Sequence, residues 1–363
     1  MTNKPNTPTF QQEFKKVVDQ LRDPYNQMKM KNRTISVLLS ILRFLLLFAL
    51  MFVILFPIFQ QLSLAFRDPS ELNDPTVIWV PKNWSMLNIE IAMDILKFQE
   101  SLINSLILSA IVMVLQVLVT SITGYAFARL QFRGSNLLFL LVVITIIMPP
   151  QTLSIPRQLF FQNFDILAGP ISWITKKPGG IITRIFGAPF NLLSPERSWY
   201  SLFIMTGLGM GLNSGIFIFI FRQFFKNIPK ELDESAEVDG ASVIRTFWSV
   251  VLPNARPAML TVGLFAFVWQ YNDVYYARLL KLSPEETNPL ISVKLSAAAE
   301  NIRQALLYAG ANVRVGTHIY NNPYYVNLIA NTAAVLMMLP ILFLFILLQR
   351  HFVEGIERTG IVG

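Results

Sequence analysis

Residues 229–253 read PKELDESAEVDGASVIRTFWSVVLP, a polar stretch that lies between two strongly apolar parts of the chain. This stretch predicts two short helices joined by a turn. Asn227 is a candidate N-cap of the first helix, and Pro229 would lie in its first turn, where a missing N–H is harmless. Asp239 and Gly240 indicate the turn, because glycine adopts a positive φ without steric strain. Pro253 is expected to end the second helix.

The second predicted helix carries an apolar stripe. Its apolar residues lie at offsets of four, seven and eight, which is the spacing of one helix face: Val243, Phe247, Val250 and Val251. An amphipathic helix pair favours docking into a groove on a soluble partner. We therefore expect Val243, Phe247 and Val251 to form an apolar anchor toward that partner. The alternative is an ordinary solvated loop, although about 30 residues is long for a loop in a compact protein.

The composition indicates a membrane protein. The chain has 363 residues, of which 53% are hydrophobic and only 14% are charged, whereas a soluble domain carries about 25% charged residues. Several apolar runs are long enough to cross a bilayer. The absence of cysteine excludes disulfides and thiolate metal sites, and two distant histidines do not suggest a metal site. We attribute the net charge of +8 to orientation in the membrane rather than to nucleic-acid binding.

We expect an all-α polytopic membrane fold with six transmembrane helices and the helix pair of 229–253 on one side. The expected spans are roughly 35–66, 102–128, 137–155, 198–221, 255–271 and 327–348, each near the length that a membrane helix needs. The first span is overlong and contains Pro57, so we expect tilt or a kink. Six spans place both termini on the same side.

Lysine and arginine indicate which side is cytosolic. The N-terminus, the loop with Arg129 and Arg133, residues 229–253 and the tail hold about 16 basic residues in roughly 90, against about 13 in roughly 130 on the other side. We therefore place the segment 1–34, residues 229–253 and the tail 349–363 in the cytosol. The loops 67–101, 157–197 and 277–326 would lie outside, and the domain would span 35–363.

The segment 1–34 has two open interpretations. Phe10, Phe14 and Val17 recur at helical spacing, which favours a short helix on the cytosolic membrane face. A disordered basic tail that obeys the positive-inside rule fits the same residues equally well.

Three glycines mark one face of the fourth expected span. Gly207, Gly211 and Gly215 lie at i, i+4 and i+8, a spacing that lets another helix approach closely. The sequence leaves open whether the neighbour belongs to this chain or to a second subunit.

The polar stretch also has an ordered pattern of residue types: Glu234, Ser235 and Ala236, then Gly240 after three residues, then Val250, Leu252 and Pro253 after nine more. This pattern resembles the "EAA" loop of ABC importer permeases, with Ser235 in place of an alanine and Val250 in place of an isoleucine. We call residues 229–253 the coupling segment.

Other stretches resemble the maltose-type carbohydrate permeases among these importers, specifically the shorter partner, similar to the maltose system's G subunit. They are GYAFARLQFRG (124–134), MPPQTLSIP (148–156), WQYND (269–273) and the tail QRHFVEGIERTGIVG (349–363). The resemblance spans about 35–363, apart from insertions in the outer loops. The tail departs from the family pattern, because Val362 stands where a lysine is usual.

The resemblance implies the type I ABC importer fold in a bacterial plasma membrane. It implies a heterodimer with a second permease, two cytosolic ATPase subunits and an extracytoplasmic sugar-binding protein, with a sugar or oligosaccharide as cargo. The chain lacks the G-x-x-x-x-G-K-[ST] phosphate loop, so ATP and Mg would be bound by the partner ATPase subunits and this chain would hold no cofactor. It would not be an enzyme. ATPase coupling would fall to Glu234, Ser235, Ala236, Asp239, Gly240, Phe247, Val250, Leu252 and Pro253.

A secondary, ion-coupled sugar transporter or a channel is the alternative. Such carriers usually place ionisable residues near mid-membrane, whereas Arg43 lies near one end of the first expected span and Asp273 just past the fifth. A polytopic membrane enzyme would need a catalytic cluster, and none is evident in the sequence.

A sugar path should be lined by aromatic rings and amides. The candidates are Asn104, Gln116, Asn213, Gln270, Tyr271, Asn272 and Asn331. The alternative for each is a hydrogen bond that holds two helices together, which is common for single amides in a bundle.

The loops 157–197 and 277–326 are long, and residues 293–308 look helical. Trp173 and Trp199 suit an interfacial position. We expect these loops to dock the binding protein or to bridge to the second permease. Lineage-specific decoration is the alternative.

Overall fold

The computed structural model describes residues 24–72, 74, 80–130, 132–176, 178–195, 197–283 and 287–360. Within these ranges the chain is helical, and the β-type pairings are two isolated bridges, Arg67 with Trp84 and Phe164 with Phe190. The expected all-α class is therefore confirmed. The chain divides into two units, Met1–Ser63 and Leu64–Gly363. The helix predicted around Phe10 lies outside the described residues, and so does Val362.

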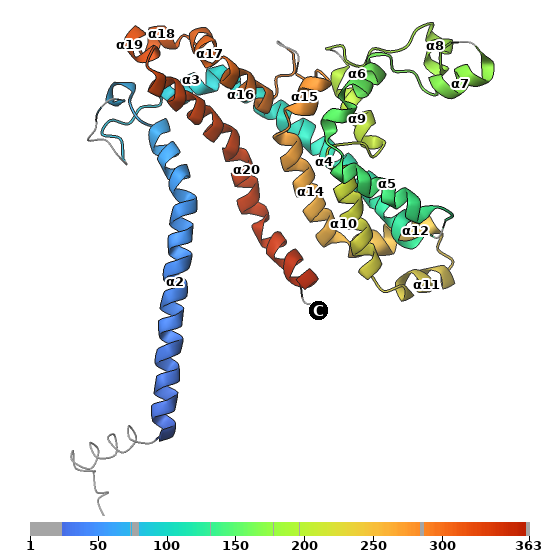
Figure 1. The fold of residues 1–363 in the computed structure, drawn as a ribbon, viewed down its shortest axis with the longest axis horizontal. Coiled ribbons are helices and arrows are strands. Elements are labelled where there is room, and N and C mark those ends of the chain that lie inside the picture. The colour runs from blue at the N-terminus through green and yellow to red at the C-terminus, as the bar shows by residue number, and fades with distance from the viewer. Residues whose placement is uncertain are drawn as a thin grey trace, which may run out of the picture. The chain divides into compact units, whose positions relative to one another are not determined.

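In the part of the chain that the structure describes, the first unit consists of most of helix α2, Pro24–Ala65. This helix begins eleven residues before the expected span, and Figure 1 shows it as one continuous coil that includes Pro57. Its apolar side chains are exposed from residue 35 to residue 54, for example Leu38 and Val53, and several of those that follow are half-buried. In water such a surface would be strongly unfavourable, which fits a helix that a bilayer surrounds.

The second unit is built around α4, Phe98–Arg129. Helices α10 (Ser214–Asn227), α14 (Arg256–Tyr271) and α9 (Ser198–Gly207) pack against it. A Cβ atom at Gly124 would lie 2.6 Å from the Cβ of Phe221, so only glycine permits the close approach of α4 and α10. Phe217, Phe221 and Val262 are fully buried in the core between these helices.

The number of membrane spans stays a prediction. Three helices of the described residues are long and apolar enough to cross a membrane: Lys31–Ala65, Phe98–Arg129 and Pro323–Gln349. The count rises to five if each of two bent helix pairs forms one span.

The expected span 137–155 is wrong as a single helix. Helix α5 (Ser135–Ile147) ends before Pro149, a 3₁₀ turn η2 follows at Pro150–Leu153, and α6 (Ser154–Gln162) leaves at an angle of 106° to α5. Two consecutive prolines remove backbone donors and disfavour helical geometry in the residue before them.

The expected span 198–221 is also interrupted. Helices α9 and α10 are separated by an irregular stretch in which Gly209 and Asn213 have positive φ values of 74° and 57°. The single glycine face is therefore wrong. A Cβ at Gly211 would lie 2.8 Å from Gln116 of α4, and one at Gly215 would lie 2.7 Å from Thr145 of α5, so these glycines accommodate two different helices.

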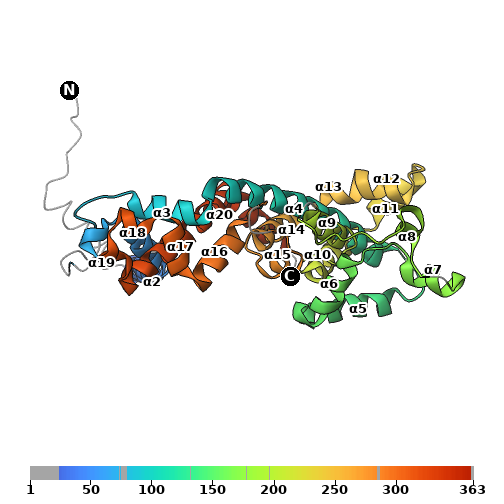
Figure 2. The ribbon, with the colours of Figure 1, turned by 90° about the horizontal axis from the view of Figure 1, so that it is seen from above.

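Short helices gather at one end of the second unit, which we call the distal end. They are η1 (Pro69–Glu71), α3 (Leu87–Leu96), α15 (Tyr275–Leu279), α16 (Ile291–Glu300), α17 (Ile302–Tyr308), α18 (Ala311–Arg314) and α19 (Thr317–Tyr320). The expected helical stretch 293–308 is thus helical but divided at Asn301. Figures 1 and 2 show α17–α19 far from the coupling segment with its helices α11 (Glu231–Val238) and α12 (Val243–Thr246).

Two further elements complete the second unit. Helix α20, Pro323–Gly360, contains the expected last span and continues into the tail. Residues 164–190 form an insert with two short helices, α7 (Ala168–Thr175) and α8 (Ile181–Phe186).

Candidate coupling segment

The first helix of the coupling segment is α11, Glu231–Val238, and it ends as predicted. Gly240 has a φ of +78°, which confirms the expected turn. The Gly240 N–H donates to the Glu237 carbonyl and the Ala241 N–H to the Ala236 carbonyl, both at 2.9 Å. This pair of bonds satisfies the last carbonyls of the helix and requires the left-handed conformation at Gly240.

The beginning of α11 differs from the prediction. Asn227 is the last residue of α10 and does not cap α11, and Pro229 lies between the two helices. Lys230 precedes α11 without a side-chain cap. The acidic first turn of α11 compensates, because carboxylates at Glu231 and Asp233 interact favourably with the positive end of the helix.

The second half of the segment is one bent helical path. Ser242 caps α12 (Val243–Thr246), a π-helical turn η3 follows at Phe247–Val251, and α13 (Leu252–Asn254) completes it. Pro253 therefore lies inside α13, one residue before its end. An angle of 81° separates this path from α14, so the segment leads directly into a long apolar helix.

Of the three expected anchor residues, Val243 is 46% exposed, whereas Phe247 and Val251 face this chain's own core, so the predicted contact of these two with a partner is corrected. Their side chains are 4% and 0% exposed. The ring of Phe247 lies 5.0 Å from Tyr125 of α4 and 6.3 Å from Phe225 of α10, centre to centre. Burial of apolar side chains is favourable wherever another apolar surface is near. Helices α4 and α10 provide that surface for Phe247 and Val251.

A different apolar face of the coupling segment is exposed. Val238 of α11 is 89% exposed, and Ile244 and Trp248 of the following path are 71% and 47% exposed. Sequence reasoning missed this face, although the spacing of four between Ile244 and Trp248 was a usable signal. These three residues are the most exposed large apolar side chains of the coupling segment, and Val243 and Leu232 are exposed beside them, so the segment has apolar surface available for a partner.

An ion pair fastens α11 to the end of α4. Nε of Arg129 lies 3.0 Å from Oδ2 of Asp233, and both side chains are largely buried, at 6% and 16% exposed. Arg129 also donates a hydrogen bond of 2.6 Å to the carbonyl of Ile228. The pair therefore joins the coupling segment to the central helix. The sequence held no signal for this pairing, because the two residues are far apart along the chain.

The other predicted coupling residues divide between surface and core. Glu234, Ser235, Asp239, Gly240 and Pro253 are exposed, Ala236 and Leu252 are buried, and Val250 is half-buried. Glu234 lines a cavity of about 780 Å³ together with basic residues of α4, α10 and the loops beside them: Arg129, Arg133, Arg222, Lys226 and Lys230. Asp233 and Glu237 line the same cavity, so the charged residues that share it with Glu234 are mostly basic.

None of the predicted sugar-path residues lines either of the two cavities described for residues 24–360, and their role in a sugar path stays a prediction. Gln116 is fully buried, donates to the Leu212 carbonyl and accepts from Ser214. It thereby supports the break between α9 and α10. Asn104, Tyr271 and Asn272 donate hydrogen bonds to the backbone carbonyls of Pro289, Met337 and Val268, respectively. Gln270 is buried, and Asn213 and Asn331 are exposed.

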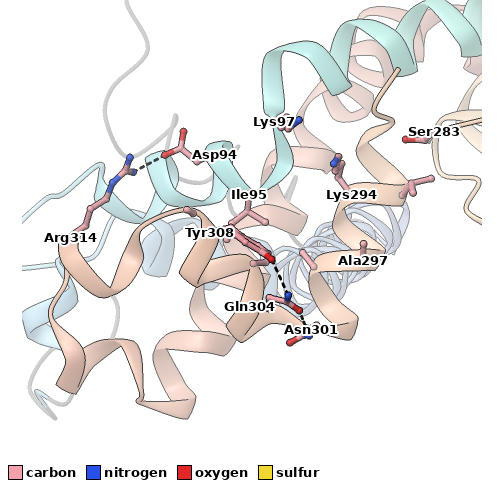
Figure 3. A pocket seen from close by; sticks show the side chains of 14 residues that line it. Asp94, Ile95, Lys97, Ser283, Lys294, Ala297, Asn301, Gln304, Tyr308 and Arg314 are labelled. Atoms are coloured by element: carbon pink, nitrogen blue, oxygen red, sulfur yellow. Dashed lines mark hydrogen bonds and ion pairs between the residues drawn. The ribbon is translucent and has the colours of Figure 1, made fainter. Parts of the chain in front are cut away.

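The distal end contains a cavity of about 920 Å³, which we call the distal pocket. Figure 3 shows its lining, which comes from α3, α16, α17 and α18. Asp94 and Arg314 form an ion pair of 2.8 Å at one side. Asn301 donates to Gln304, which donates in turn to the hydroxyl of Tyr308, at 2.6 and 3.2 Å. The pocket therefore combines charged and hydrogen-bonding groups with apolar side chains, among them Ile95 and Val293.

Comparisons with known proteins agree with this arrangement. The chain is 28% identical over 265 residues to a maltodextrin transport system permease protein of Bacillus subtilis, covering 72% of this chain and 74% of the other. It is 26% identical to an arabinooligosaccharides transport system permease protein of Halalkalibacterium halodurans, covering 92% of this chain and all of the other. A crystal structure of a bacterial ABC transporter involved in alginate import has the same fold, with a TM-score of 0.61 at 20% identity, covering 87% and 96% of the two chains.

The family model for binding-protein-dependent transport systems matches residues 116–358, which include α10, the coupling segment and α14. The matched region is most of the second unit, so the likeness extends well beyond one motif. The chain belongs to the family described as the inner membrane component of binding-protein-dependent transport systems.

Proposed function

We propose that this chain, a permease subunit of an ABC importer, moves a sugar or an oligosaccharide into the cell by alternating access. The cargo is proposed from two relatives that are named for maltodextrin and arabino-oligosaccharide transport. Two separate ATPase subunits bind ATP and Mg and drive the cycle, and a second permease completes the membrane path. This chain makes and breaks no covalent bond.

The observation that carries the proposal is the position of the coupling segment. Its α11 is fastened to α4 by the Arg129–Asp233 pair, and its second half leads into α14. A push on this segment therefore acts on two long helices at once. The exposed face of Val238, Ile244 and Trp248 supplies the apolar contact for a groove on an ATPase subunit.

The proposed orientation places the coupling segment and both termini in the cytosol and the distal end outside. The bias of lysine and arginine supports it, as does the need for the ATPase subunits to meet ATP. The distal pocket then faces the sugar-binding protein. Its lining of mixed polar and apolar side chains suits a soluble partner that must bind and leave, because reversible interfaces are about as polar as the rest of a protein surface.

Gly240 provides the test of coupling. Its φ of +78° is inaccessible to proline, although a Cβ there would meet no atom within 4 Å. We expect Gly240→Pro to remain in the membrane, to lose co-purifying ATPase and to abolish ATP-driven sugar uptake. Gly240→Ala should be milder, because a left-handed alanine costs on the order of 1 kcal/mol.

Gly187 is the matched control. It also has a positive φ, +83°, and open space around a Cβ, but it lies in the insert, so Gly187→Pro should keep both the ATPase and uptake. Normal uptake and ATPase retention in Gly240→Pro would make the segment an ordinary loop. Uptake by the purified chain alone, driven by a proton or sodium gradient, would instead favour the secondary transporter.

A further inference from the structure

The insert 164–190 has a fixed shape of its own. Phe164 and Phe190 exchange backbone hydrogen bonds of 2.9 and 3.0 Å at its base. The buried carboxylate of Asp165 accepts hydrogen bonds from the backbone N–H groups of Gly180 and Ile182, at 2.6 and 2.8 Å. These contacts hold the start of α8 against the residues that precede α7, so the insert presents a defined surface.

That surface is apolar and exposed. Six large apolar side chains of the insert are between 47% and 84% exposed: Ile166, Leu167, Trp173, Ile174, Ile185 and Phe186. The two helices carry one charged residue, Arg184. A soluble surface rarely leaves so many large apolar groups in contact with water, so a partner must cover them.

The charges beside this surface favour a lipid partner. The loop 157–197 holds five basic and two acidic residues, and one of the acids, Asp165, is buried and fully engaged with the insert. Lys176 directly follows α7 and Arg184 lies in α8. Tryptophan and basic side chains collect where acyl chains meet headgroups, and anionic lipids attract the basic ones.

The geometry favours a position on the bilayer rather than across it. With eight and six residues, α7 and α8 are about 12 and 9 Å long, whereas the hydrocarbon core is about 30 Å thick. Helix α6 leads toward the insert after its sharp bend from α5, and it exposes Ile155 and Leu159 one turn apart. Figures 1 and 2 both show α7 and α8 at the edge of the unit, away from α14 and α20.

We propose that the insert is a membrane-surface anchor. The apolar side chains of α7 and α8 lie among the acyl chains of the outer leaflet, and Lys176 lies at the level of the lipid phosphates. The side assigned to it rests on the proposed orientation, but lipid contact itself does not. This assignment replaces the expected docking of the binding protein at loop 157–197, because the charged and hydrogen-bonding groups of the distal pocket match that soluble partner better than the apolar insert does.

Spin labels test the proposal directly, because the chain has no cysteine. Single cysteines at Ile174 and Ile185 would carry the label in the full chain with its co-purifying subunits, in vesicles of phosphatidylethanolamine and phosphatidylglycerol. Oxygen concentrates in lipid and a nickel chelate stays in water. We expect oxygen to relax both labels several-fold more effectively than nickel.

Two control positions give the reference accessibilities to oxygen and nickel for a label in lipid and for a label in water. Phe343 lies in the apolar part of α20 and is 65% exposed, so Phe343→Cys reports lipid, whereas Val313 of α18 is 84% exposed at the distal end and Val313→Cys reports water. Labels at 174 and 185 should resemble the first. Resemblance to the second overturns the anchor, and so does protection from both reagents that disappears when the binding protein or the second permease is removed. Uptake by the labelled protein tests the transport function separately.

The attraction between Lys176 and anionic lipid headgroups can be measured separately. In vesicles of neutral phosphatidylcholine the labels at 174 and 185 should become more accessible to nickel, and Lys176→Gln should produce the same shift in the anionic vesicles. A depth that depends on neither lipid charge nor Lys176 would contradict the headgroup contact.

Discussion

Two buried aspartates of the loops have pKa values that move in opposite directions. Burial raises the pKa of Asp273 to about 6, although the N–H groups of Tyr276 and Ala277 bond to its carboxylate and oppose the rise. Burial would also raise the pKa of Asp165, but hydrogen bonds from Thr183, Gly180 and Ile182 outweigh it and lower that pKa. Whether the pKa of a buried carboxylate rises or falls depends on the balance between desolvation, which raises it, and hydrogen-bond donors, which lower it.

Asp273→Asn should therefore change how stability depends on pH. The folded pKa is above the unfolded value of 3.8, so the favourable contribution of Asp273 is complete below that value and is lost as the pH rises through 6. The free energy of unfolding of the native chain should fall by about 2–3 kcal/mol relative to Asp273→Asn between pH 4 and 7. Thermal unfolding in detergent across this range measures it.

Asp165→Asn is the control with the opposite sign. Because its folded pKa is lowered, the stabilisation by Asp165 is present above the unfolded pKa and is lost as the pH falls through the folded one. The native chain should then lose its advantage over Asp165→Asn in acid. Parallel pH profiles for the native chain and Asp273→Asn would contradict the raised pKa.

Single residues also show what the sequence could predict. Gly240 was predictable because a left-handed turn depends on local chemistry alone. The burial of Phe247 was not, because the same apolar stripe could face either a partner or α4 and α10. Which face is buried depends on helices distant in sequence, and Ile244 with Trp248 formed an equally valid stripe.

Among the helices, the uninterrupted spans were predictable and the broken ones were not, because a break can depend on contacts with residues distant in sequence. The expected spans at 102–128 and 327–348 lie within α4 and α20, and the one at 255–271 matches α14 to within one residue, because a long apolar run has few alternatives to a helix. The break between α9 and α10 was hidden, because it depends on Gln116 of α4 bonding to the Leu212 carbonyl and to Ser214. The prolines at 149 and 150 were visible, but apolar neighbours on both sides masked their effect.

The link between α4 and α11 can be tested by charge reversal. Arg129→Asp and Asp233→Arg should each place two like charges in a largely buried site, which is costly by several kcal/mol. We expect both to reduce ATPase retention and the amount of sugar taken up per ATP hydrolysed. The double variant should recover part of the loss, but not all, because Arg129 also bonds to the Ile228 carbonyl.

The exposed pair of Lys82 and Asp74 is the matched control. Their ends are 2.8 Å apart, but the side chains are 56% and 32% exposed, so reversing either should matter by at most about 1 kcal/mol. If the double variant at 129 and 233 transports no better than the single ones, the ion pair does not connect the coupling segment to α4.

On the scale of the whole molecule, the two ends of the second unit differ in their chemistry. One end offers the exposed apolar face of the coupling segment, and the other offers the distal pocket, with its charged and hydrogen-bonding groups, and the apolar insert. The sequence predicted that the long loops would carry function, from their length alone. The sequence could not show that residues 277–326 help to line a cavity, whereas residues 157–197 present an apolar surface. The cavity depends on which side chains α16, α17 and α18 turn toward α3.

The distal pocket should determine how tightly the sugar-binding protein docks. Ala297 lies on its wall and is exposed, so Ala297→Trp would fill the cavity without touching the coupling segment. We expect the concentration of binding protein that gives half-maximal ATP hydrolysis to rise about tenfold, which corresponds to about 1.4 kcal/mol of lost affinity. The rate at saturating binding protein should stay unchanged, because the ATPase contact is at the other end.

Val313→Trp, on the exposed side of α18 and outside the pocket lining, should leave the half-maximal concentration near its native value. Equal half-maximal concentrations for the native chain and Ala297→Trp would show that the binding protein docks elsewhere, whereas a lower maximal rate with unchanged half-saturation would assign the pocket to a step after docking.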